Sequence, residues 1–544
     1  MAKLFEHEGK RALALRGMSV PRGRVVKDPD EARVAAIELG GQAVVKAQVW
    51  DTDRARRGGI RFVTTPNEAR AAADEIFASK ALGQRVESVL VEERLEVARE
   101  FYIGAAVDDR VRRLVLLFSA LGGSGIEGRK ESVLRLPVSV RREPTRQELR
   151  HELLAREMLE AELEEKLLAA LLILYRTARE TEARSIEINP LAWTSDRRLV
   201  ALDCRLSVDD YAVFRHPELG IEIAREFGHV PTPLERIAWA VERDDYRGTF
   251  YFVELVEARE GDGIPIGFHG AGGGGAMASM DAAVRVGLRP LNYADTSGNP
   301  AASKVYRAAR IILAQPGIKG YFLSGSGVAS QEQFHLARAL VKAFREEGIR
   351  VPAVLRLGGN GEELAAKIMA RFARSARAPV ETYRKEQSAE FCAQRLRALI
   401  EEDRSAPVSA EGPTFEVPPP SRPYRFRTRT GWITYDHAAC AKCETKACVI
   451  ECVPQILKLV DGLPVLAISE EEAARGRCIE CLACEVECWM QGAGGGRVEL
   501  PIPGLDEFGL PAEDQSKKEA TGIAQGAKTT RSEMTHEGTG KWPF

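Results

Sequence analysis

The sequence predicts an α/β protein of several domains that ends in a small α+β module. Its 544 residues correspond to about three or four domains at ~150 residues each. From residue 262 onward, apolar strands, glycine-rich turns and helical segments alternate, which is typical of a parallel β-sheet covered by helices. Eight of the ten cysteines lie between Cys440 and Cys488, which indicates a separate metal-binding module near the end.

The overall charge does not point to nucleic acid or to a membrane surface. The chain has 77 Lys and Arg against 79 Asp and Glu, a formal net charge of -2, and its basic runs are short. The first residues alternate charged and apolar side chains, unlike a secretion signal. The longest apolar run, residues 167–175, is much shorter than the ~20 residues that cross a bilayer. We therefore expect a soluble cytoplasmic protein whose cysteines are reduced.

Helices and strands alternate in the first part of the chain. Helices are predicted over residues 4–17, 31–39 and 68–77, and strands over residues 42–49, 59–64 and 88–92. The segment 146–180 is strongly helical with charged residues on its outer face, so we expect it to serve packing.

Four polar side chains near predicted strand ends could bind a nucleotide and its metal ion. Lys46 ends an apolar strand, so its amine could reach a triphosphate. Glu92, at another strand end, could accept a hydrogen bond from an adenine amine or a ribose. Asn189 and Asp203 lie on or directly after two adjacent strands, and their oxygens are ligands that Mg²⁺ prefers. Simpler interpretations stay open, because a lysine after a strand is often solvated and an Asn-Pro pair often forms a turn.

Glycine-rich turns follow four predicted strands in the second half of the chain. The strands cover residues 264–268, 288–293, 320–323 and 353–357, and the turns are HGAGGGG, DTSGNP, SGSGVAS and LGGNGEE. In parallel α/β units such turns lie at the carboxyl edge of the sheet, where free amides at helix starts bind anions. The turns are equally a structural feature of the fold, so both interpretations stay open. His269, in the first turn, is expected to be a packed, hydrogen-bonded residue.

Six segments in the first half of the chain occur in a characteristic order. They are LFEHEGKRALALRG, VVKAQV, LVEERLEVAREFYIGA, GGSGIE, IEINPL and LDCRLSVDDYAVFR, and RLGGNGEELAAKI follows later. Together they resemble the β subunit of succinyl-CoA synthetase and related NDP-forming acyl-CoA synthetases. The resemblance covers about residues 1–400. It implies an ATP-grasp domain over residues 1–240 and a flavodoxin-like CoA-ligase domain over residues 241–402.

The resemblance implies roles for the matching residues. Nucleotide, ATP or GTP, would be bound by Lys46, Arg54, Glu92 and Glu100, and Mg²⁺ by Asn189 and Asp203. The turn from Gly325 to Gly327 would start a helix that points at a phosphorylated histidine. In the family that histidine and CoA binding belong to a separate α subunit, which nothing in this chain resembles. We therefore expect a hetero-oligomer with an α-like, CoA-binding partner, and we assign no catalytic residue to this chain.

The loop after the VVKAQV strand departs from that family. The family has a glycine-rich loop that covers the phosphates, whereas residues 50–59 are WDTDRARRGG, in which Arg54 and the closing glycines match. Glycines let backbone amides approach a phosphate, and acidic side chains repel it. The nucleotide site is therefore either altered or vestigial.

The clustered cysteines form two groups of four with metal-cluster spacing. They are Cys440, Cys443, Cys448 and Cys452, then Cys478, Cys481, Cys484 and Cys488. The two-two-three spacing of the second group places three thiolates round one cubane and sends the fourth to a neighbouring cluster. Zinc sites and disulfides are the alternatives. Zinc usually takes separated pairs of cysteines, and a large chain without a secretion signal rarely forms disulfides.

This pattern resembles the two-cluster bacterial ferredoxins, which implies two [4Fe-4S] clusters. By that resemblance one cluster is held by Cys440, Cys443, Cys448 and Cys488, and the other by Cys478, Cys481, Cys484 and Cys452. Four residues separate Cys443 from Cys448 where two are usual, so the nuclearity of the first cluster stays open. We place the ferredoxin-like module at residues 431–510, between a proline-rich linker over 403–430 and a polar, disordered tail over 511–544.

Two functions fit these observations, and a third joins them. The first is the β-type subunit of a nucleotide-dependent acyl-CoA synthetase that carries iron–sulfur clusters. The second is an electron-transfer subunit of an acyl-CoA or 2-oxoacid oxidoreductase, with the ATP-grasp part as a docking scaffold and an oxidoreductase or electron carrier as partner. The third couples ATP hydrolysis or CoA-ester formation to a redox step. The altered loop at residues 50–59 is evidence against the synthetase function, and the presence of Asn189 and Asp203 is evidence against the electron-transfer function. We favour the first.

Overall fold

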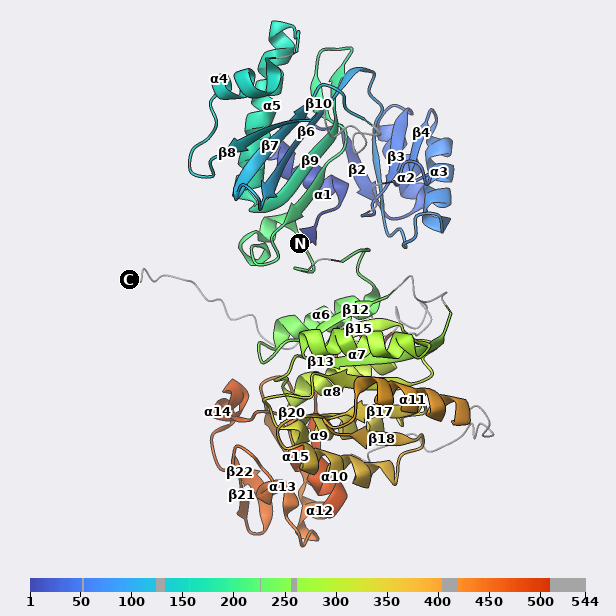
Figure 1. Ribbon diagram of the computed structural model, residues 1–544, viewed down its shortest axis with the longest axis vertical. Helices are drawn as coiled ribbons and strands as arrows, with labels where there is room; N and C mark the ends of the chain where they lie inside the picture. The colour runs from blue at the N-terminus through green and yellow to red at the C-terminus, as the bar shows by residue number, and fades with distance from the viewer. Residues whose placement is uncertain are drawn as a thin grey trace. The chain divides into compact units, whose positions relative to one another are not determined.

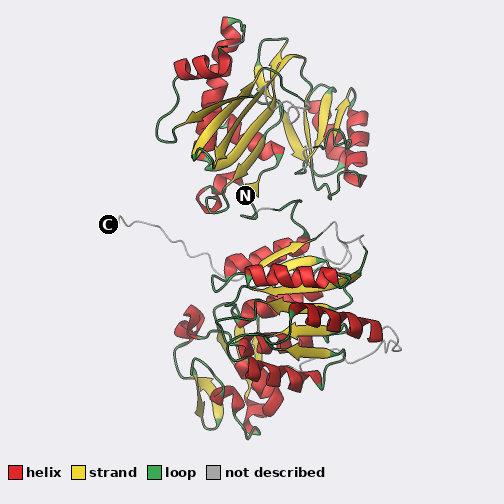
Figure 2. Ribbon diagram, viewed as in Figure 1, coloured by secondary structure: helices red, strands yellow, loops and turns green. Residues whose placement is uncertain are grey.

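The computed structural model describes residues 1–50, 53–123, 133–155, 157–225, 227–255, 262–403 and 419–508. It divides into two compact units, Met1–Pro231 and Thr232–Phe544, each with its own sheets (Figure 1). Helices and strands are present in both units (Figure 2). None of the helices in the described ranges combines the length and the apolar character that a bilayer crossing requires. The predicted tail lies outside the described residues, as does most of the predicted linker.

A four-stranded antiparallel sheet and two helices form one part of the first unit. The strand order is β2 (Gly23–Val26), β5 (Val89–Glu93), β3 (Ala43–Ala47) and β4 (Ile60–Val63). The helices are α2 (Pro29–Glu38) and α3 (Pro66–Ala78). Each begins with a proline behind a capping side chain, since Asp28 and Thr65 accept hydrogen bonds from backbone N–H groups of the first turn. Alanines of both helices pack against valines of the strands.

A seven-stranded antiparallel sheet forms the other part of the first unit. The strand order is β1 (Ala2–Lys3), β11 (Arg205–Val208), β9 (Ala183–Thr194), β6 (Val97–Asp108), β7 (Arg113–Ser119) and β8 (Leu134–Val138), and β10 (Leu199–Ala201) pairs with β9. Helices α1 (Glu6–Ala14) and α5 (Ala161–Glu180) share a core with this sheet. Leu13, Leu167 and Leu171 are fully buried in it.

The predicted helical segment 146–180 is not continuous. Helix α4 covers Arg146–Leu149, a π-helical turn follows over Arg150–Leu154, and α5 begins only at Ala161. Met158, between them, is 98% exposed. Met158 therefore contributes none of the buried apolar surface that stabilises most helices in proteins.

The second unit contains a sheet of seven strands, most of them parallel. The order is β12 (Tyr251–Glu254), β15 (Asn292–Asp295), β13 (Ile264–Ala271), β16 (Tyr321–Gly325), β17 (Ala353–Arg356) and β18 (Val380–Tyr383), and β14 (Leu288–Pro290) pairs with β13. Only β12 pairs antiparallel among the described strands of this sheet. The single strand predicted over residues 288–293 is two strands, because β14 pairs with the start of β13 and β15 with its end.

Helices cover both faces of this sheet. One core includes α6 (Pro233–Asp244), α8 (Ala302–Leu313), α9 (Gln333–Glu346) and α10 (Glu362–Ala373), and the other includes α7 (Gly273–Arg285) and α11 (Ala389–Asp403). Strand alternation separates them, since Tyr321 and Leu323 of β16 face the first core and Phe322 faces the second. The parallel strands and glycine turns therefore have the arrangement expected of βα units.

The cysteine-rich module completes the second unit. Its three-stranded antiparallel sheet has the order β19 (Pro423–Arg427), β20 (Trp432–Asp436) and β23 (Gly496–Glu499), and β21 (Leu457–Val460) forms a hairpin with β22 (Leu463–Leu466). Its helices are α12 (His437–Ala441), α13 (Ala447–Ile450), α14 (Glu470–Glu472) and α15 (Ala483–Gln491). Strand β19 lies inside the segment predicted as a linker, because Phe426 is buried and pairs opposite Ile433.

Candidate functional site

Six charged side chains of the first unit form one network, which we call the charged cluster. Its members are Glu6, Lys10, Lys46, Arg54, Glu92 and Asp203. The side chain of Asp203 is the most exposed, at 21%. Strand alternation explains the position of Lys46 and Glu92. Their neighbours Val45 and Val91 point into the alanine-rich core, so Lys46 and Glu92 point to the opposite face of the sheet.

Glu6 lies at the centre of the charged cluster. Its carboxylate is 2.6 Å from Lys10 Nζ and 2.9 Å from Lys46 Nζ, and it accepts a hydrogen bond from Arg54 Nη2. Burial by itself raises the pKa of Glu6, but the charges of Arg54, Lys10 and Lys46 hold it well below its usual value. Glu6 is therefore ionised, and it holds both Lys46 and Arg54, the two cations that the family resemblance assigns to nucleotide binding. Its presence in LFEHEGK was the signal that could have identified it.

Glu92 and Asp203 neutralise the remaining positive charge of the cluster. Glu92 lies 2.6 Å from Lys10 Nζ and 2.9 Å from Lys46 Nζ, and Asp203 Oδ2 accepts a hydrogen bond from Arg54 at 3.0 Å. Burial lowers the pKa of Lys46, yet the carboxylates of Glu6 and Glu92 raise it above its usual value. Three cations and three carboxylates leave the charged cluster with no net charge.

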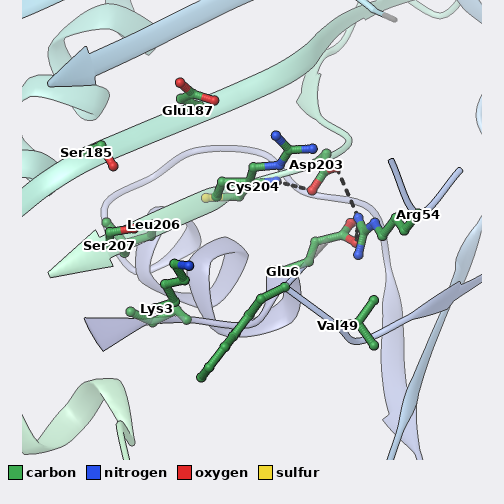
Figure 3. Close-up of a pocket in the computed structure, with 13 residues that line it drawn as sticks. Lys3, Glu6, Val49, Arg54, Ser185, Glu187, Asp203, Cys204, Leu206 and Ser207 are labelled. Atoms are coloured by element: carbon green, nitrogen blue, oxygen red, sulfur yellow. Dashed lines mark hydrogen bonds and ion pairs between the residues drawn. The ribbon is translucent and has the colours of Figure 1, made fainter. Parts of the chain in front are cut away.

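A pocket of about 220 Å³ lies beside the charged cluster (Figure 3). Glu6, Arg54 and Asp203 line it, and Figure 3 shows Arg54 next to both carboxylates. Glu187 of β9 lines the same pocket. This residue was not predicted, although it stands within IEINPL, two positions before Asn189. The pocket therefore brings carboxylates and a guanidinium to one surface.

The two predicted magnesium ligands come from neighbouring strands of one sheet. Asn189 lies on β9, and Asp203 lies in the short segment between β10 and β11, both of which pair with β9. Asp203 lines the 220 Å³ pocket, and Asn189 is not among the described residues that line it. The side chain of Asn189 is also held locally, since Oδ1 accepts the Gly123 N–H at 2.7 Å and Nδ2 donates to Gly123 O at 3.2 Å. An amide oxygen has two lone pairs, so one remains for a metal ion.

Glu100 lies in a different pocket. That pocket has a volume of about 590 Å³ and includes Arg99, Glu100 and Gly122 in its wall. No member of the charged cluster is among the described residues that line it. The structure therefore brings four predicted nucleotide and metal residues into the charged cluster, but it places Glu100 apart from them.

The loop after β3 carries Arg54 back into the protein. Trp50 stacks on Phe5 with ring centroids 5.5 Å apart, and residues 51 and 52 lie outside the described residues. Arg54 is 5% exposed and donates to Ala47 O at 3.0 Å in addition to its two carboxylate partners. The loop thus supplies a buried guanidinium where glycine amides were expected from the family.

In the second unit, glycine turns meet beside β13 and β16. Asp295 accepts hydrogen bonds from the N–H groups of Gly272 and Gly273, both at 2.9 Å, so a carboxylate occupies the amino end of α7. Gly327 has a φ of 75°, a conformation that favours glycine. Arg356 donates to Gly325 O at 2.6 Å. The turn that contains both predicted glycines is therefore held by Arg356.

His269 is packed inside the second unit. It is fully buried, with Nδ1 at 2.5 Å from the Tyr321 hydroxyl and Nε2 at 3.0 Å from Thr296 Oγ1. Burial lowers the pKa of His269 to about 3, so the ring is neutral at physiological pH. Its contacts are those of the hydrogen-bonded core residue that the sequence suggested.

The clustered cysteines separate into two groups of neighbours. Cys452, Cys478, Cys481 and Cys484 line one cavity. Cys440, Cys443 and Cys488 lie beside one run of glycines. Burial raises the pKa of Cys448, and so do the thiols of Cys488, Cys440 and Cys443, which places Cys448 with the set beside the glycines. Each spatial group therefore takes one cysteine from the other stretch of sequence, namely Cys488 and Cys452. From here on, the first group is Cys440, Cys443, Cys448 and Cys488, and the second group is Cys452, Cys478, Cys481 and Cys484. The assignment of these two groups to two clusters, which the resemblance to two-cluster ferredoxins implies, stays a prediction.

The second group of cysteines surrounds a cavity. All four thiol-bearing residues of this group line it, together with apolar residues such as Ile433, Ile456 and Val498. Within the described ranges, no three His, Cys, Asp or Glu side chains form a set that could hold a metal ion as they stand. The four thiols of this group therefore surround the cavity, but they do not converge on a single position as the ligands of a bound metal ion would.

A glycine strip approaches the first group of cysteines. A Cβ atom added to Gly492, Gly495 or Gly496 would lie 3.2, 3.3 or 3.4 Å from a cysteine sulfur. The Gly496 N–H donates to Cys488 Sγ at 3.3 Å. Glycine is therefore suited to this strip, because side chains would crowd the thiols. This strip was not predicted, although its run of glycines stands in the sequence as GAGGGR.

Comparison with known proteins places the first unit in a described family. The model of the ATP-grasp domain matches residues 3–193. The chain is 35% identical to the succinate–CoA ligase [GDP-forming] subunit beta of Thermus thermophilus, over 67% of this chain and 93% of the relative. It is 34% identical to succinate–CoA ligase [ADP-forming] subunit beta 2 of Archaeoglobus fulgidus, over 68% of this chain and 93% of the relative.

Solved structures agree on the fold. The ATP citrate lyase from Methanothrix soehngenii, solved in complex with citrate and coenzyme A, superposes with a TM-score of 0.57 at 18% identity, over 74% of this chain and 99% of that chain. Such a likeness concerns the fold alone. The two β subunits, by contrast, are more than 30% identical to this chain over about two thirds of its length. This chain therefore belongs to the β subunits of succinate–CoA ligase, a family of ATP-grasp ligases.

Proposed function

We propose that the chain is the β-type subunit of a nucleotide-dependent acyl-CoA synthetase that also carries two [4Fe-4S] clusters. In the proposed reaction the γ-phosphoryl group of ATP or GTP passes to a histidine of an α-like partner. The substrate carboxylate then takes the phosphoryl group as an acyl phosphate, and the thiol of CoA displaces phosphate to give the acyl-CoA. The relatives named above are β subunits of GDP-forming and ADP-forming succinate–CoA ligases, which supports this assignment.

The observation that carries the proposal is the charged cluster beside the 220 Å³ pocket. Phosphoryl transfer depends on positioning and on neutralisation of charge. Lys46 and Arg54 are suited to the phosphates, and Asp203 with Asn189 is suited to Mg²⁺, which would neutralise part of the triphosphate charge. Because the charged cluster is neutral, nucleotide binding would exchange one ion pair for two new ones. Arg54 would pair with the phosphates instead of Asp203, and Asp203 would bind the metal ion.

The remaining predicted residues have less direct roles in this proposal. Both oxygens of Glu92 are engaged by lysines, so we assign it to positioning Lys46. Glu100, in its separate pocket, and the Gly325–Gly327 turn keep the nucleotide and phosphohistidine roles that the family implies. The flavodoxin-like character of residues 241–402 and the ferredoxin-like character of residues 431–510 belong to the same proposal.

The two cysteine groups suit two iron–sulfur clusters. One cluster would be held by Cys440, Cys443, Cys448 and Cys488, and the other by Cys452, Cys478, Cys481 and Cys484. Each cluster would supply transfer of a single electron. The cavity within the second group and the glycine strip beside the first support the assignment, because both leave room next to the sulfurs.

A second function is favoured by the same neutral charged cluster. Every cation in it already has a carboxylate partner, as in a network that only stabilises the fold. In that case the chain is an electron-transfer subunit of an acyl-CoA or 2-oxoacid oxidoreductase, and its ATP-grasp domain is a docking scaffold. Binding of nucleotide separates the two functions.

Calorimetry with Mg-ATP on the anaerobically purified full chain tests the proposal. We expect one binding site per chain, and we expect Asp203→Asn to weaken Mg-dependent binding at least about tenfold, since a metal-ligand charge is lost. Asp196→Asn is the matched control, because Asp196 is an exposed partner of Arg198 outside the charged cluster. Absence of binding would instead support the docking scaffold, whereas equal binding by Asp203→Asn and wild type would show that Asp203 does not hold the metal ion.

A further inference from the structure

Helix α9 packs against helix α15, which carries cysteines of both groups. Cys484 and Cys488 lie on α15, and Glu485 and Glu487 lie between them. Each of these glutamates is only 5% exposed. An ionised carboxylate in such a position is costly unless a cation pairs with it. The partners of these two glutamates therefore determine the charge next to the thiols.

Both partners come from α9. Arg338 donates to Glu487 Oε1 through Nε at 3.1 Å and Nη2 at 3.0 Å, and Lys342 Nζ lies 2.8 Å from Glu485 Oε2. Arg338 is 2% exposed and Lys342 is 3% exposed. The two cations are four residues apart, so they occupy one face of the helix. The ion pairs therefore join α9 to the helix that presents both groups of cysteines.

The same arrangement recurs at the other end of the second cysteine group. Glu480, between Cys478 and Cys481, is 1% exposed. It pairs with Arg247 at 2.5 Å and accepts a hydrogen bond from the Thr428 hydroxyl at 2.6 Å. Each buried glutamate beside a cysteine is thus matched by a cation from outside the cysteine-rich module.

Arg338 also reaches the other stretch of cysteines. Its Nη2 lies 3.4 Å from Oε2 of Glu451, the neighbour of Cys452 in sequence. Three residues beyond Lys342, Arg345 places its guanidinium 4.5 Å from the ring of Trp489, the neighbour of Cys488 in sequence. A positive charge near an iron–sulfur cluster favours the reduced form, because reduction adds negative charge.

We propose that Arg338 and Lys342 are positioning residues that set the reduction potentials of the clusters through their ion pairs with Glu487 and Glu485. The charges that tune the clusters then belong to the parallel-sheet part of the chain and not to the cysteine-rich module. The module is consequently a fixed part of the second unit and not an independent electron carrier. This inference rests on the proposed clusters. Helix α9 follows directly on the turn that holds Gly325 and Gly327.

Opposite charge changes at one ion pair test the proposal. Anaerobic redox titration of the full chain, followed by electron paramagnetic resonance, measures the reduction potential of each cluster. Arg338→Met should disfavour reduction of the cluster held by the second group about tenfold, equivalent to about 59 mV for one electron. Glu487→Gln should favour reduction by a similar factor. The double variant should lie close to wild type, because its net charge is unchanged.

Two further variants separate charge from structure. Arg338→Lys keeps the charge and should stay within about twofold of wild type. If Arg338→Met loses its iron, Glu487→Gln still tests the inference, because its potential should shift in the direction that favours reduction. Arg395→Met removes an arginine that pairs with Glu381 on another face of the unit, and it should leave both potentials unchanged. Shifts of the same sign for Arg338→Met and Glu487→Gln, or no shift in either with iron retained, would overturn the inference. Wild-type protein without iron would overturn the clusters themselves, and this inference with them.

Discussion

Replacing Glu6 with glutamine is expected to destabilise the first unit by about 3–5 kcal/mol, the usual cost of leaving a buried charge without its partner. Glu6 faces Lys10, Lys46 and Arg54 inside the charged cluster. Glutamine has nearly the same shape but no charge, so the cluster changes from neutral to a net positive charge. The same change should increase the stabilisation given by added tripolyphosphate, which can pair with the released cations.

Urea denaturation of the wild type and Glu6→Gln measures this effect. The matched control is Glu180→Gln, which removes a carboxylate that is 54% exposed and pairs with Arg16 at 2.8 Å. An exposed pair contributes little, so we expect a change below about 1 kcal/mol for the control. A Glu6→Gln protein as stable as the control would show that the charged cluster is not held together by Glu6.

Single cysteine replacements are expected to remove one cluster and spare the other. Cys448 and Cys452 are close in sequence but belong to different groups. If wild type binds about eight irons, Cys448→Ser and Cys452→Ser should each retain about four. The double variant of these two should retain none. Cys452→Ser combined with Cys478→Ser should retain about four, because both changes affect the same cluster.

Iron, zinc and acid-labile sulfide analysis of anaerobically purified protein measures these outcomes. Cys392→Ala is the control, since Cys392 is a free, fully buried cysteine of α11 outside both groups. Its iron content should equal that of wild type. If the Cys448→Ser and Cys452→Ser double variant keeps half of the iron, the clusters follow the two stretches of sequence. Zinc in place of iron would remove the redox interpretation altogether.

Much of the fold could be predicted from local patterns. The alternation of strands, glycine turns and helices predicted the parallel strands of the second unit, because each βα unit has its own signal. The helical pattern of residues 146–180 predicted more helix than is present, since periodicity does not reveal that Met158 would be left exposed. Strand β19 was missed because Phe426 and its neighbours are embedded in a segment whose prolines suggested a linker.

The candidate site could be predicted only in part. Lys46, Arg54, Asn189 and Asp203 stand in recognisable segments. The structure pairs Arg54 with Asp203, and Lys46 donates to the carbonyl oxygen of Leu202, the residue before Asp203. Glu6 and Lys10 are four positions apart within LFEHEGK, but the contacts of Glu6 with Lys46 and Arg54 span 40 and 48 positions. The pairing of Arg338 with Glu487 spans 149 positions. Such contacts arise from how distant segments pack together, and no local pattern in the chain encodes them.

Phosphoryl transfer to a partner tests the central claim most directly. The complex is isolated through a tag on the full chain and incubated with Mg²⁺ and ATP that is radiolabelled in the γ-phosphate. We predict acid-labile, base-stable label, the behaviour of phosphohistidine, on a second polypeptide and not on this chain. Asp203→Asn should lose most of that label, and Asp196→Asn should keep it. An unlabelled complex that still contains the second polypeptide and iron would contradict a ligase function and favour electron transfer.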